Sequence, residues 1–552
     1  MPASVIEGAG IRVVGGRAGD GAVDGRDYTL IANSGSTIHS DSDQRPPRKR
    51  CGHGWLERLG IDRFEWGADQ VAEEDTYRNL RKPQSSFSTR DEYLENELKT
   101  MRPKRWALNL PGRDFNFEVE DIVPAISGTI GKIVMVTAIV SAFAAGFGLT
   151  PEFVVENVRF EMLIAALLFV IPVSGFLNPR VNLPGSHGPM LPLIGLIALA
   201  GGHPLALGVM VGVFGLILGL MKGGSRLVNL TGIGVRGGLL VFLGLTGLLG
   251  QIDALRAWAK PLGLELVFLV VIFVTIIVYT YLARIGKRWM AIPLCSFFAV
   301  TVALAMGAPF EFKTSPGIPN VNPFYWWGEG TGWMLGMPDL GHFIAVLPFA
   351  ILAIAMWPPD FLSHRIFQEV NYPKGSEKVF MHVDDTMIVC SARQAIGSVL
   401  GGGNLTSSWG TYIIPAGIAK RPIPAGAILT GIGCVLASLI GYPMDMAVWP
   451  PMLRVALIVG VFLPLLEAGM QMIQTKMDSW GAGLCIFGSA LINPVFGWSL
   501  AMLLDNSGVL GDAERTRSLV PVDRVAIPLA MWVICTVAMA AAGLIPGIPA
   551  LI

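Results

Sequence analysis

The fold of this chain is decided by an interrupted apolar segment, NPRVNLPGSHGPMLP at residues 178–192. A second interrupted segment, NLTSSWGTYIIP at residues 404–415, follows at the matching place in the other half of the chain. Proline and glycine at this density prevent a continuous helix. Because unwound backbone persists at membrane depth only where it is buried in protein or lines a cavity, the pair indicates a binding site of the transporter kind.

The composition places these two segments in a membrane protein. Of the 552 residues, 52% are hydrophobic and only 15% are charged, and 38 of the 82 charged residues lie in the first 120 positions. The remainder supplies many apolar runs of roughly 20 residues, the length that crosses a bilayer. We therefore expect an all-α, multi-pass protein of the inner (plasma) membrane, with a polar N-terminal extension in the cytoplasm.

The hydropathy pattern predicts about 14 transmembrane spans, arranged as two inverted seven-span repeats. The expected regions are a mostly disordered, partly helical extension at 1–120, a first repeat at 121–307, an extracytoplasmic loop at 308–340 and a second repeat at 341–552. A short helix is expected at 89–101 within the extension. An odd number of spans in each half requires the second half to enter the membrane in the opposite sense.

This topology places most basic loops on the cytoplasmic side, as membrane proteins prefer. One span is expected at 480–503, and three arginines that follow it, Arg515, Arg517 and Arg524, fall on the other side.

The composition and motifs also exclude several classes of protein. The sequence has no Gly-Lys-Ser/Thr loop of the Walker type, which argues against an ATP-driven pump. The 41 basic and 41 acidic residues balance, so no nucleic-acid partner is expected. The six cysteines lack metal-ligand spacing, and no set of nucleophile, base and oxyanion donors is apparent. We expect no metal, no cofactor and no enzymatic activity.

The chemistry of the interrupted segments follows from helix ends. A helix N-terminus offers unpaired N–H groups and about half a positive charge, so two facing N-termini would bind an anion or a polar ring. A helix is expected to begin near Ser186, and Thr406, Ser407 or Ser408 could cap another. The predicted substrate-binding residues are Ser186, His187, Gly188, Thr406, Ser407, Ser408, Trp409 and Gly410. The alternative is that these small residues only permit close helix packing.

A candidate coupling pair lies in MWPPDFLSH at residues 356–364, near the predicted end of the span at 341–357. Asp360 and His364 are four residues apart, so they share a helix face if the helix continues. A carboxylate beside an imidazole can take up a proton or hold a sodium ion. Capping of a helix end at the cytoplasmic surface is the alternative.

Three other polar residues fall inside predicted spans. Lys132 is expected to reach the membrane interface or to pair with a carboxylate. Arg393 and Gln394 could serve an anion pathway or bind a carbonyl group.

From about residue 120 to 550 these features resemble the superfamily of uracil and xanthine permeases, sulfate permeases and bicarbonate and borate anion exchangers. The resemblance rests on the order of spans, the broken third span of each half and the carboxylate in the first span of the second half. Asp360 and His364 are similar to the Glu and His of proton-coupled uracil permeases, whereas KGSEKVFMHVDD at 374–385 is more similar to the anion exchangers. The whole chain most resembles an uncharacterised bacterial integral membrane family related to these.

The resemblance implies a fourteen-span fold, usually a homodimer, divided into a core domain of spans one to four and eight to eleven and a gate domain of the others. The sequence departs from the nucleobase permeases at Thr406 to Trp409, where those proteins use an acid to hold the ring.

Together these features predict a secondary active transporter of a small anion or polar solute, favouring an oxyanion such as sulfate or bicarbonate. Transport would be coupled to H⁺ or Na⁺ by an elevator-like movement. A proton symporter for a nucleobase of the uracil or xanthine type is the alternative, since Trp357 and Trp409 could stack on a ring. An anion channel and a membrane sensor or scaffold are alternatives of other classes.

Overall fold

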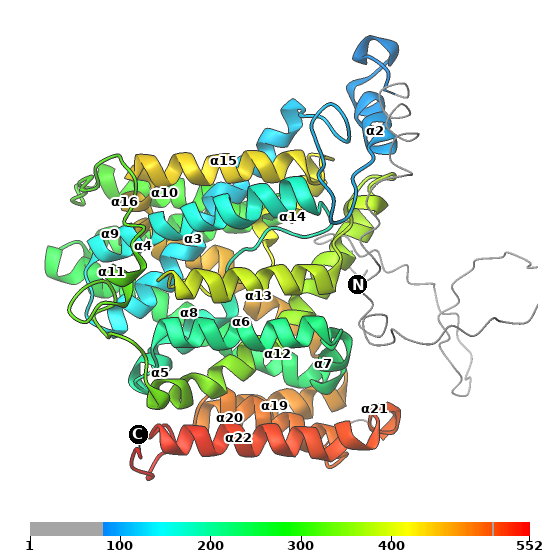
Figure 1. Cartoon of the computed structure of the whole chain (residues 1–552). Helices are drawn as coiled ribbons and strands as arrows, with labels where there is room; N and C mark the ends of the chain where they lie inside the picture. The colour runs from blue at the N-terminus through cyan, green and yellow to red at the C-terminus, as the bar shows by residue number, and fades with distance from the viewer. Residues whose placement is uncertain (1–80, 511–512, 552) are drawn as a thin grey trace, which may run out of the picture. The chain divides into compact units, whose positions relative to one another are not determined.

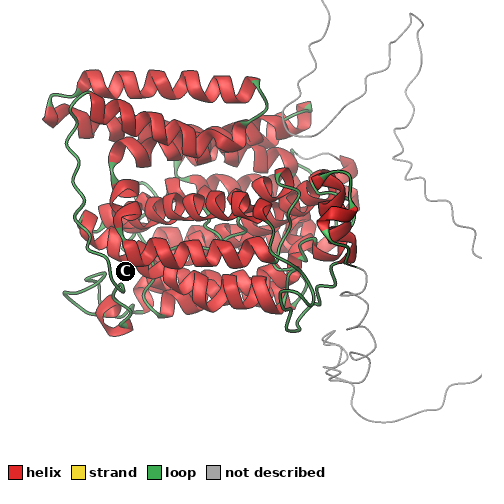
Figure 2. Cartoon of the chain, turned by 90° about the horizontal axis from the view of Figure 1, so that it is seen from above, coloured by secondary structure: helices red, strands yellow, loops and turns green. Residues whose placement is uncertain are grey.

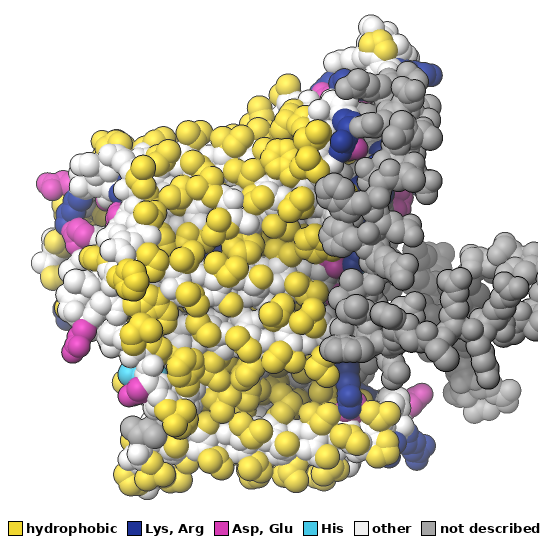
Figure 3. Space-filling view, viewed as in Figure 1, with side chains coloured by type: hydrophobic (Ala, Val, Ile, Leu, Met, Phe, Trp, Pro, Cys, Tyr) yellow, Lys and Arg dark blue, Asp and Glu magenta, His cyan; other side chains and the backbone are white. Residues whose placement is uncertain are grey.

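The computed structural model describes residues 81–510 and 513–551. Within these ranges the chain forms helices, with only isolated β-bridges, which confirms the all-α class. Eight of the described helices are long and apolar enough to cross a membrane, and a bent pair makes a ninth if it counts as one span. The long helices run side by side (Figures 1 and 2). Apolar side chains cover the visible face along their length, with charged side chains at the ends (Figure 3), as a multi-pass integral membrane protein requires.

The first half of the membrane region runs from α3 to α10. Its helices are α3 (Ile122–Gly146), α4 with the π-helix η4 (Pro151–Ile164, Ala165–Leu177), η5 with α5 (Gly188–Leu193, Ile194–Leu199), α6 (Pro204–Leu220), α7 (Gly224–Leu230), α8 (Ile233–Ala259), α9 (Glu265–Arg284) and α10 (Ala291–Ala305).

The second half runs from α12 to α22. Its helices are α12 (Leu340–Asn371), α13 (Val383–Val399), α14 (Gly410–Ile418), α15 (Ala425–Ile440), α16 (Tyr442–Val448), α17 with the π-helix η9 and α18 (Pro450–Leu457, Ile458–Phe462, Leu463–Met472), α19 (Lys476–Leu491), α20 (Pro494–Asn506), α21 (Ala513–Ser518) and the π-helix η10 with α22 (Val522–Ala526, Ile527–Ala541).

Helix α12 is longer than its predicted span, which was to end near residue 357. It continues through Pro358 and Pro359 to Asn371. The two prolines remove backbone donors, but their fixed φ is compatible with a helix, so the chain keeps its course. Asp360 and His364 therefore lie inside a continuous helix, one turn apart.

The span predicted at 480–503 is wrong as a single helix. Helix α19 ends at Leu491, and α20 begins at Pro494 after Asn493, whose side chain caps the new helix. A Cβ added to Gly488 would lie 2.8 Å from the Cα of Gly497, so the two helices fold back against each other. Small residues at this contact allow the close approach.

This hairpin corrects the predicted topology. Because α20 returns along α19, the segment after it lies beside α7 and not at the opposite end of the helices. Arg515 donates to the carbonyl of Asn229 at 2.9 Å, and Arg226 pairs with Asp523 at 2.7 Å. The basic residues assigned to the far side thus lie at the same end as the other basic loops, which the preference for basic residues on one side favours.

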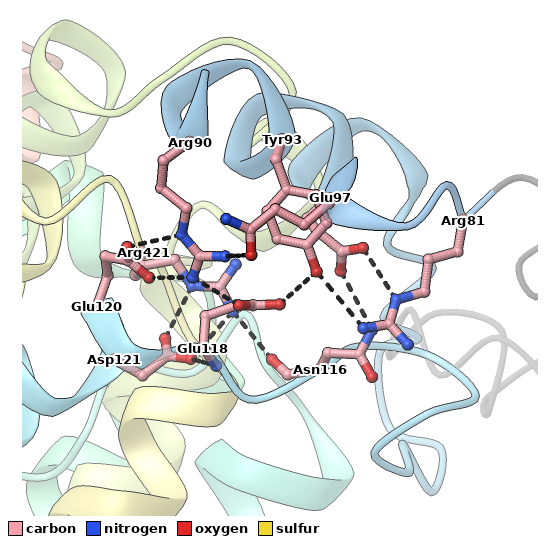
Figure 4. Close-up of polar contacts among 10 residues, drawn as sticks. Arg81, Arg90, Tyr93, Glu97, Asn116, Glu118, Glu120, Asp121 and Arg421 are labelled. Carbon is pink, nitrogen blue, oxygen red and sulfur yellow. Dashed lines mark hydrogen bonds and ion pairs between the residues drawn. The ribbon is translucent and has the colours of Figure 1, made fainter. Parts of the chain in front are cut away.

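The N-terminal extension is described only from residue 81, and the disorder predicted for its earlier part falls outside the described residues. The expected short helix is confirmed as α2 (Arg90–Thr100), which begins with a capping box of Thr89 and Glu92. Arg90 contacts Glu118 and Glu120, and the nearby Arg421 binds Asp121 at the start of α3 (Figure 4).

The connection at 308–340 carries a short helix, α11 (Pro323–Trp327). Trp326 of α11 and Trp333, farther along the connection, are both buried. The indole N–H of Trp333 donates to the carbonyl of Gly401 at 2.9 Å. Gly401 has a φ of +107°, a conformation that favours glycine, and a Cβ there would lie 2.1 Å from Trp326. The connection therefore packs on the entry to the second interrupted segment.

Candidate functional site

The two interrupted segments lie side by side as extended chains. The N–H of Gly185 donates to the carbonyl of Ser407 at 2.6 Å, and that of His187 donates to Leu405 at 2.7 Å. Pro184 and Ser408 form an antiparallel bridge. A Cβ on Gly185 would lie 2.8 Å from the Cα of Trp409, so glycine is what permits this approach. Each segment satisfies backbone groups of the other, as buried non-helical backbone requires.

A short helix leaves each segment in the opposite direction along α3. Thr411 at the start of α14 packs on Gly131, and Tyr412 packs on Gly128. Met135, further along α3, lies 3.1 Å from the Cβ position of Gly188, where η5 begins, and Ala198 of α5 meets Gly146. The N-termini of the two short helices therefore meet near residues 131–135 of α3. The N–H of Gly188 in η5, which is followed by Pro189, and the N–H groups of Gly410 and Thr411 in α14 have no partner within their own helix.

Lys132 occupies this meeting point. Its side chain is 1% exposed, and Nζ donates to the carbonyl of Gly185 at 2.7 Å, and to Pro184 and the hydroxyl of Ser186 at 3.3 Å each. The ammonium lies 5.2 Å from the ring of Trp409. Neither expected role of Lys132 holds: its side chain is buried and does not reach the membrane interface, and within the described residues its acceptors are all neutral. The site thus has a lysine, which the segments alone did not reveal.

The structure brings the predicted coupling pair to the second segment. Ser407 donates its hydroxyl to Asp360 at 2.6 Å, and His364 shares a 2.8 Å hydrogen bond with the hydroxyl of Ser408. The nearest ring nitrogen of His364 is 4.0 Å from Asp360. The serine hydroxyls are therefore engaged by α12, and the predicted serine or threonine cap is wrong: Trp409 is the N-cap, without a side-chain cap bond.

A buried polar frame holds the second segment from the opposite side. Arg393 of α13 pairs with Glu161 of α4, both fully buried, and donates to the hydroxyl of Thr406 at 2.8 Å. Glu161 accepts from the N–H of Asn404 at 2.8 Å. Gln394 accepts from the N–H of Thr406 and donates to the carbonyl of Asn404 at 3.0 Å. Gln394 therefore binds a carbonyl, one of the two roles left open for it, whereas the partners of Arg393 in the described chain are a carboxylate and a hydroxyl.

Two buried side chains of the site keep unused polar atoms. His187 is 2% exposed, and within the described chain neither ring nitrogen has a hydrogen-bond partner. The indole N–H of Trp409, also 2% exposed, is likewise without one. Buried polar atoms are nearly always bonded to protein or water. Two such side chains at one place leave donors and acceptors for a solute or for water.

All predicted site residues therefore lie around one point, although not all as expected. The hydroxyl of Ser186 binds Lys132, those of Ser407 and Ser408 bind α12, and Gly188 and Gly410 begin the short helices. Glu161 and Lys132 were not assigned to the site from sequence. Their signal was present as ionisable residues inside apolar helices, but their partners lie about 240 and 50 positions away.

Fold and site together define a multi-pass integral membrane protein with two interrupted segments that pair in its buried interior. The chain belongs to the family described as "Protein of unknown function (DUF3360)", whose model matches residues 68–552. A search of curated proteins found no match.

Solved structures similar to this chain include transporters. One is the murine Solute Carrier 26 family member A9 (Slc26a9) anion transporter in the inward-facing state, with 12% identity and a TM-score of 0.49, covering 80% of this chain and 75% of that one. Another is the transmembrane domain of a cyanobacterium bicarbonate transporter, BicA, with 14% identity and a TM-score of 0.44, covering 70% of this chain and 98% of that one.

Proposed function

We propose that this protein is a secondary active transporter of a small anion. The observation that carries the proposal is the position of Lys132. Among the described residues the acceptors of its buried ammonium are all neutral, and it lies where the N-termini of two short helices meet. Each N-terminus adds about half a positive charge. Since an uncompensated buried charge is costly, a bound anion would stabilise this arrangement.

The donors around this point favour an oxyanion such as sulfate or bicarbonate. Hydroxyls, the imidazole of His187 and the indole N–H of Trp409 can surround several oxygens at once. The rings on which a nucleobase would stack are already in contact with other groups. Trp357 stacks on Phe361 at 5.7 Å, and Trp409 lies beside the Lys132 ammonium.

Coupling to H⁺ or Na⁺ is assigned to Asp360 and His364. Both contact a serine of the second segment, so a proton or sodium ion at Asp360 would change what Ser407 offers to a substrate. Their side chains are 34% and 17% exposed, which leaves a route for the coupling ion.

An elevator-like movement is supported by how the helices pack. Two groups of helices each pack mainly among themselves. The first group consists of α3, α4, α6, α12, α13, α14 and α15, and the second of α8, α9, α10, α17, α18 and α19. The second group has a hydrophobic cluster of its own, which includes Phe268 and Val455. The paired segments belong to the first group, the proposed core, and Gly188 faces Val461 of the second, the proposed gate.

The test is uptake of labelled sulfate and bicarbonate by the purified protein in proteoliposomes, under imposed proton or sodium gradients. Lys132→Gln should lower uptake about tenfold or more, since a hydrogen bond to a charged group contributes about 1.5–3 kcal/mol. Lys260→Gln, at the exposed end of α8, is the matched control and should transport normally. Asp360→Asn should abolish accumulation against a gradient.

Elution volume and melting temperature show whether each variant is folded. Normal uptake by a folded Lys132→Gln variant would overturn the assignment of the site. If unlabelled anion on the far side of the membrane fails to accelerate uptake of the labelled anion, the protein is a channel.

A further inference from the structure

A cavity lies apart from the paired segments, between the two groups of helices. Its volume is about 200 Å³, far above the roughly 10–15 Å³ that one water needs. Ala138, Leu191 and Pro192 line it from the proposed core, and Thr246 and Phe462 line it from the proposed gate. Ala138 follows Met135 on α3, so the cavity begins about 5 Å beyond the helix meeting point, toward the end that carries the connection at 308–340.

Arg454 is the charged residue among those that line this cavity. One guanidinium nitrogen donates to the side-chain oxygen of Gln251, also in the lining, at 2.9 Å. The Nε atom is buried without a partner in the described part of the chain. Within that part, the hydrogen bond to Gln251 is neutral, and no carboxylate pairs with Arg454. A half-buried guanidinium without a carboxylate beside an open volume attracts anions.

The floor of the cavity separates it from the paired segments. The ring of Phe462 packs where Gly247 lacks a side chain, 2.1 Å from a Cβ position there. The neighbouring Val461 packs 3.2 Å from the Cβ position of Gly188. Both residues belong to η9, and a π-helical turn within an α-helix often marks a functional position.

We propose that this cavity is a vestibule that binds a small oxyanion at Arg454 before it reaches the paired segments. The planar fork of the guanidinium suits two oxygens of one anion. Gln251 holds the guanidinium from one side and leaves its other nitrogens for the ligand. The purpose of the vestibule rests on the proposed anion transport, but binding at Arg454 does not.

The experiment measures the rate at which thiol reagents modify Thr246→Cys in intact cells. Two membrane-impermeant methanethiosulfonates are compared, one carrying a sulfonate and one a quaternary ammonium. The anionic reagent should react about tenfold faster relative to the cationic one, because a cleft of one charge concentrates its counterion. Arg454→Gln should remove this preference, and Arg454→Lys should keep most of it. Arg256→Gln, exposed at the end of α8, is the matched control and should change nothing.

Sulfate in the medium should slow the anionic reagent and leave the cationic one unaffected, and Arg454→Gln should abolish this protection. The proposal would be overturned if the Thr246→Cys chain reacted at the same rate with both reagents, or if Arg454→Gln left the preference for the anionic reagent unchanged. The chain without Thr246→Cys gives the background from the native cysteines, of which the five in the described residues are buried. This experiment measures no transport, so its result is separate from that of the uptake assay. Anion-selective labelling without uptake would count against the transporter alone. Uptake with charge-independent labelling would count against the vestibule alone.

Discussion

Two buried cations differ in what neutralises them, and this difference decides their roles. Arg393 pairs with Glu161, so the pair is neutral and holds the backbone of the second segment. Within the described residues, Lys132 donates its hydrogen bonds to carbonyls and a hydroxyl and pairs with no carboxylate. A paired charge in low dielectric supports structure, whereas an unpaired charge is most stable when a counterion binds.

Arg421 provides a test of the paired kind. It is 2% exposed and makes two 3.0 Å hydrogen bonds to Asp121, which is fully buried. Arg421→Ala should lower the free energy of unfolding by about 3–5 kcal/mol, because it leaves the Asp121 carboxylate buried alone. The measurement is thermal unfolding in detergent.

The adjacent lysine is the matched control for this change. Lys420 pairs with Asp91 at an exposed site, so Lys420→Ala should cost only about 0–1 kcal/mol. Adding Asp121→Asn to Arg421→Ala should recover part of the loss. Equal destabilisation by the two alanine variants would show that the buried pair contributes no more to the free energy of unfolding than the exposed pair.

At the scale of elements, the interrupted helices show what a sequence can and cannot predict. Prolines and glycines at 184–192 predicted the break correctly, because they restrict the local backbone. The antiparallel pairing of the segments depends on contacts some 220 positions apart, which local rules do not contain. The hairpin of α19 and α20 was missed although Asn493 and Pro494 mark the start of a new helix, because apolar residues continue on both sides of this pair.

Gly185 tests whether the close pairing of the segments is needed. Gly185→Ala places a methyl group 2.8 Å from the Cα of Trp409, where backbone must move. We expect anion-dependent thermal stabilisation to be lost, because the short helices no longer meet as they do here. Gly195→Ala, ten positions later in α5, has open space around its Cβ and should bind normally, with a gain of about 0.5–1 kcal/mol from helix propensity. If anions still raise the melting temperature of Gly185→Ala, the close spacing of the two segments is not needed for anion binding.

At the scale of the whole molecule, the described N-terminal segment is fastened to one group of helices. Arg105 makes a two-fold contact with Asp385 of α13, at 2.7 and 2.8 Å. Asn109 donates to the carbonyl of Phe176 in η4, and Lys378 donates to that of Met101 at 2.6 Å. With the Arg421 contact, these bonds reach α13, η4, the α12–α13 loop and the loop after α14. Each belongs to the proposed core, so the segment would move with the substrate site.

The path of the chain after the hairpin gives the last prediction. Asn506 at the end of α20 donates to the carbonyl of Leu230, so residues 507–510 lie at the same end of the helices as α7. Helix α22 then crosses to the other end, where the chain terminates (Figure 1). In cells, a cysteine at Val509 should react with an impermeant thiol reagent only after the membrane is opened, as should one at Lys222, whereas one at Leu551 should react at once. A single helix over 480–503 would reverse the results for Val509 and Leu551 and leave Lys222 unchanged.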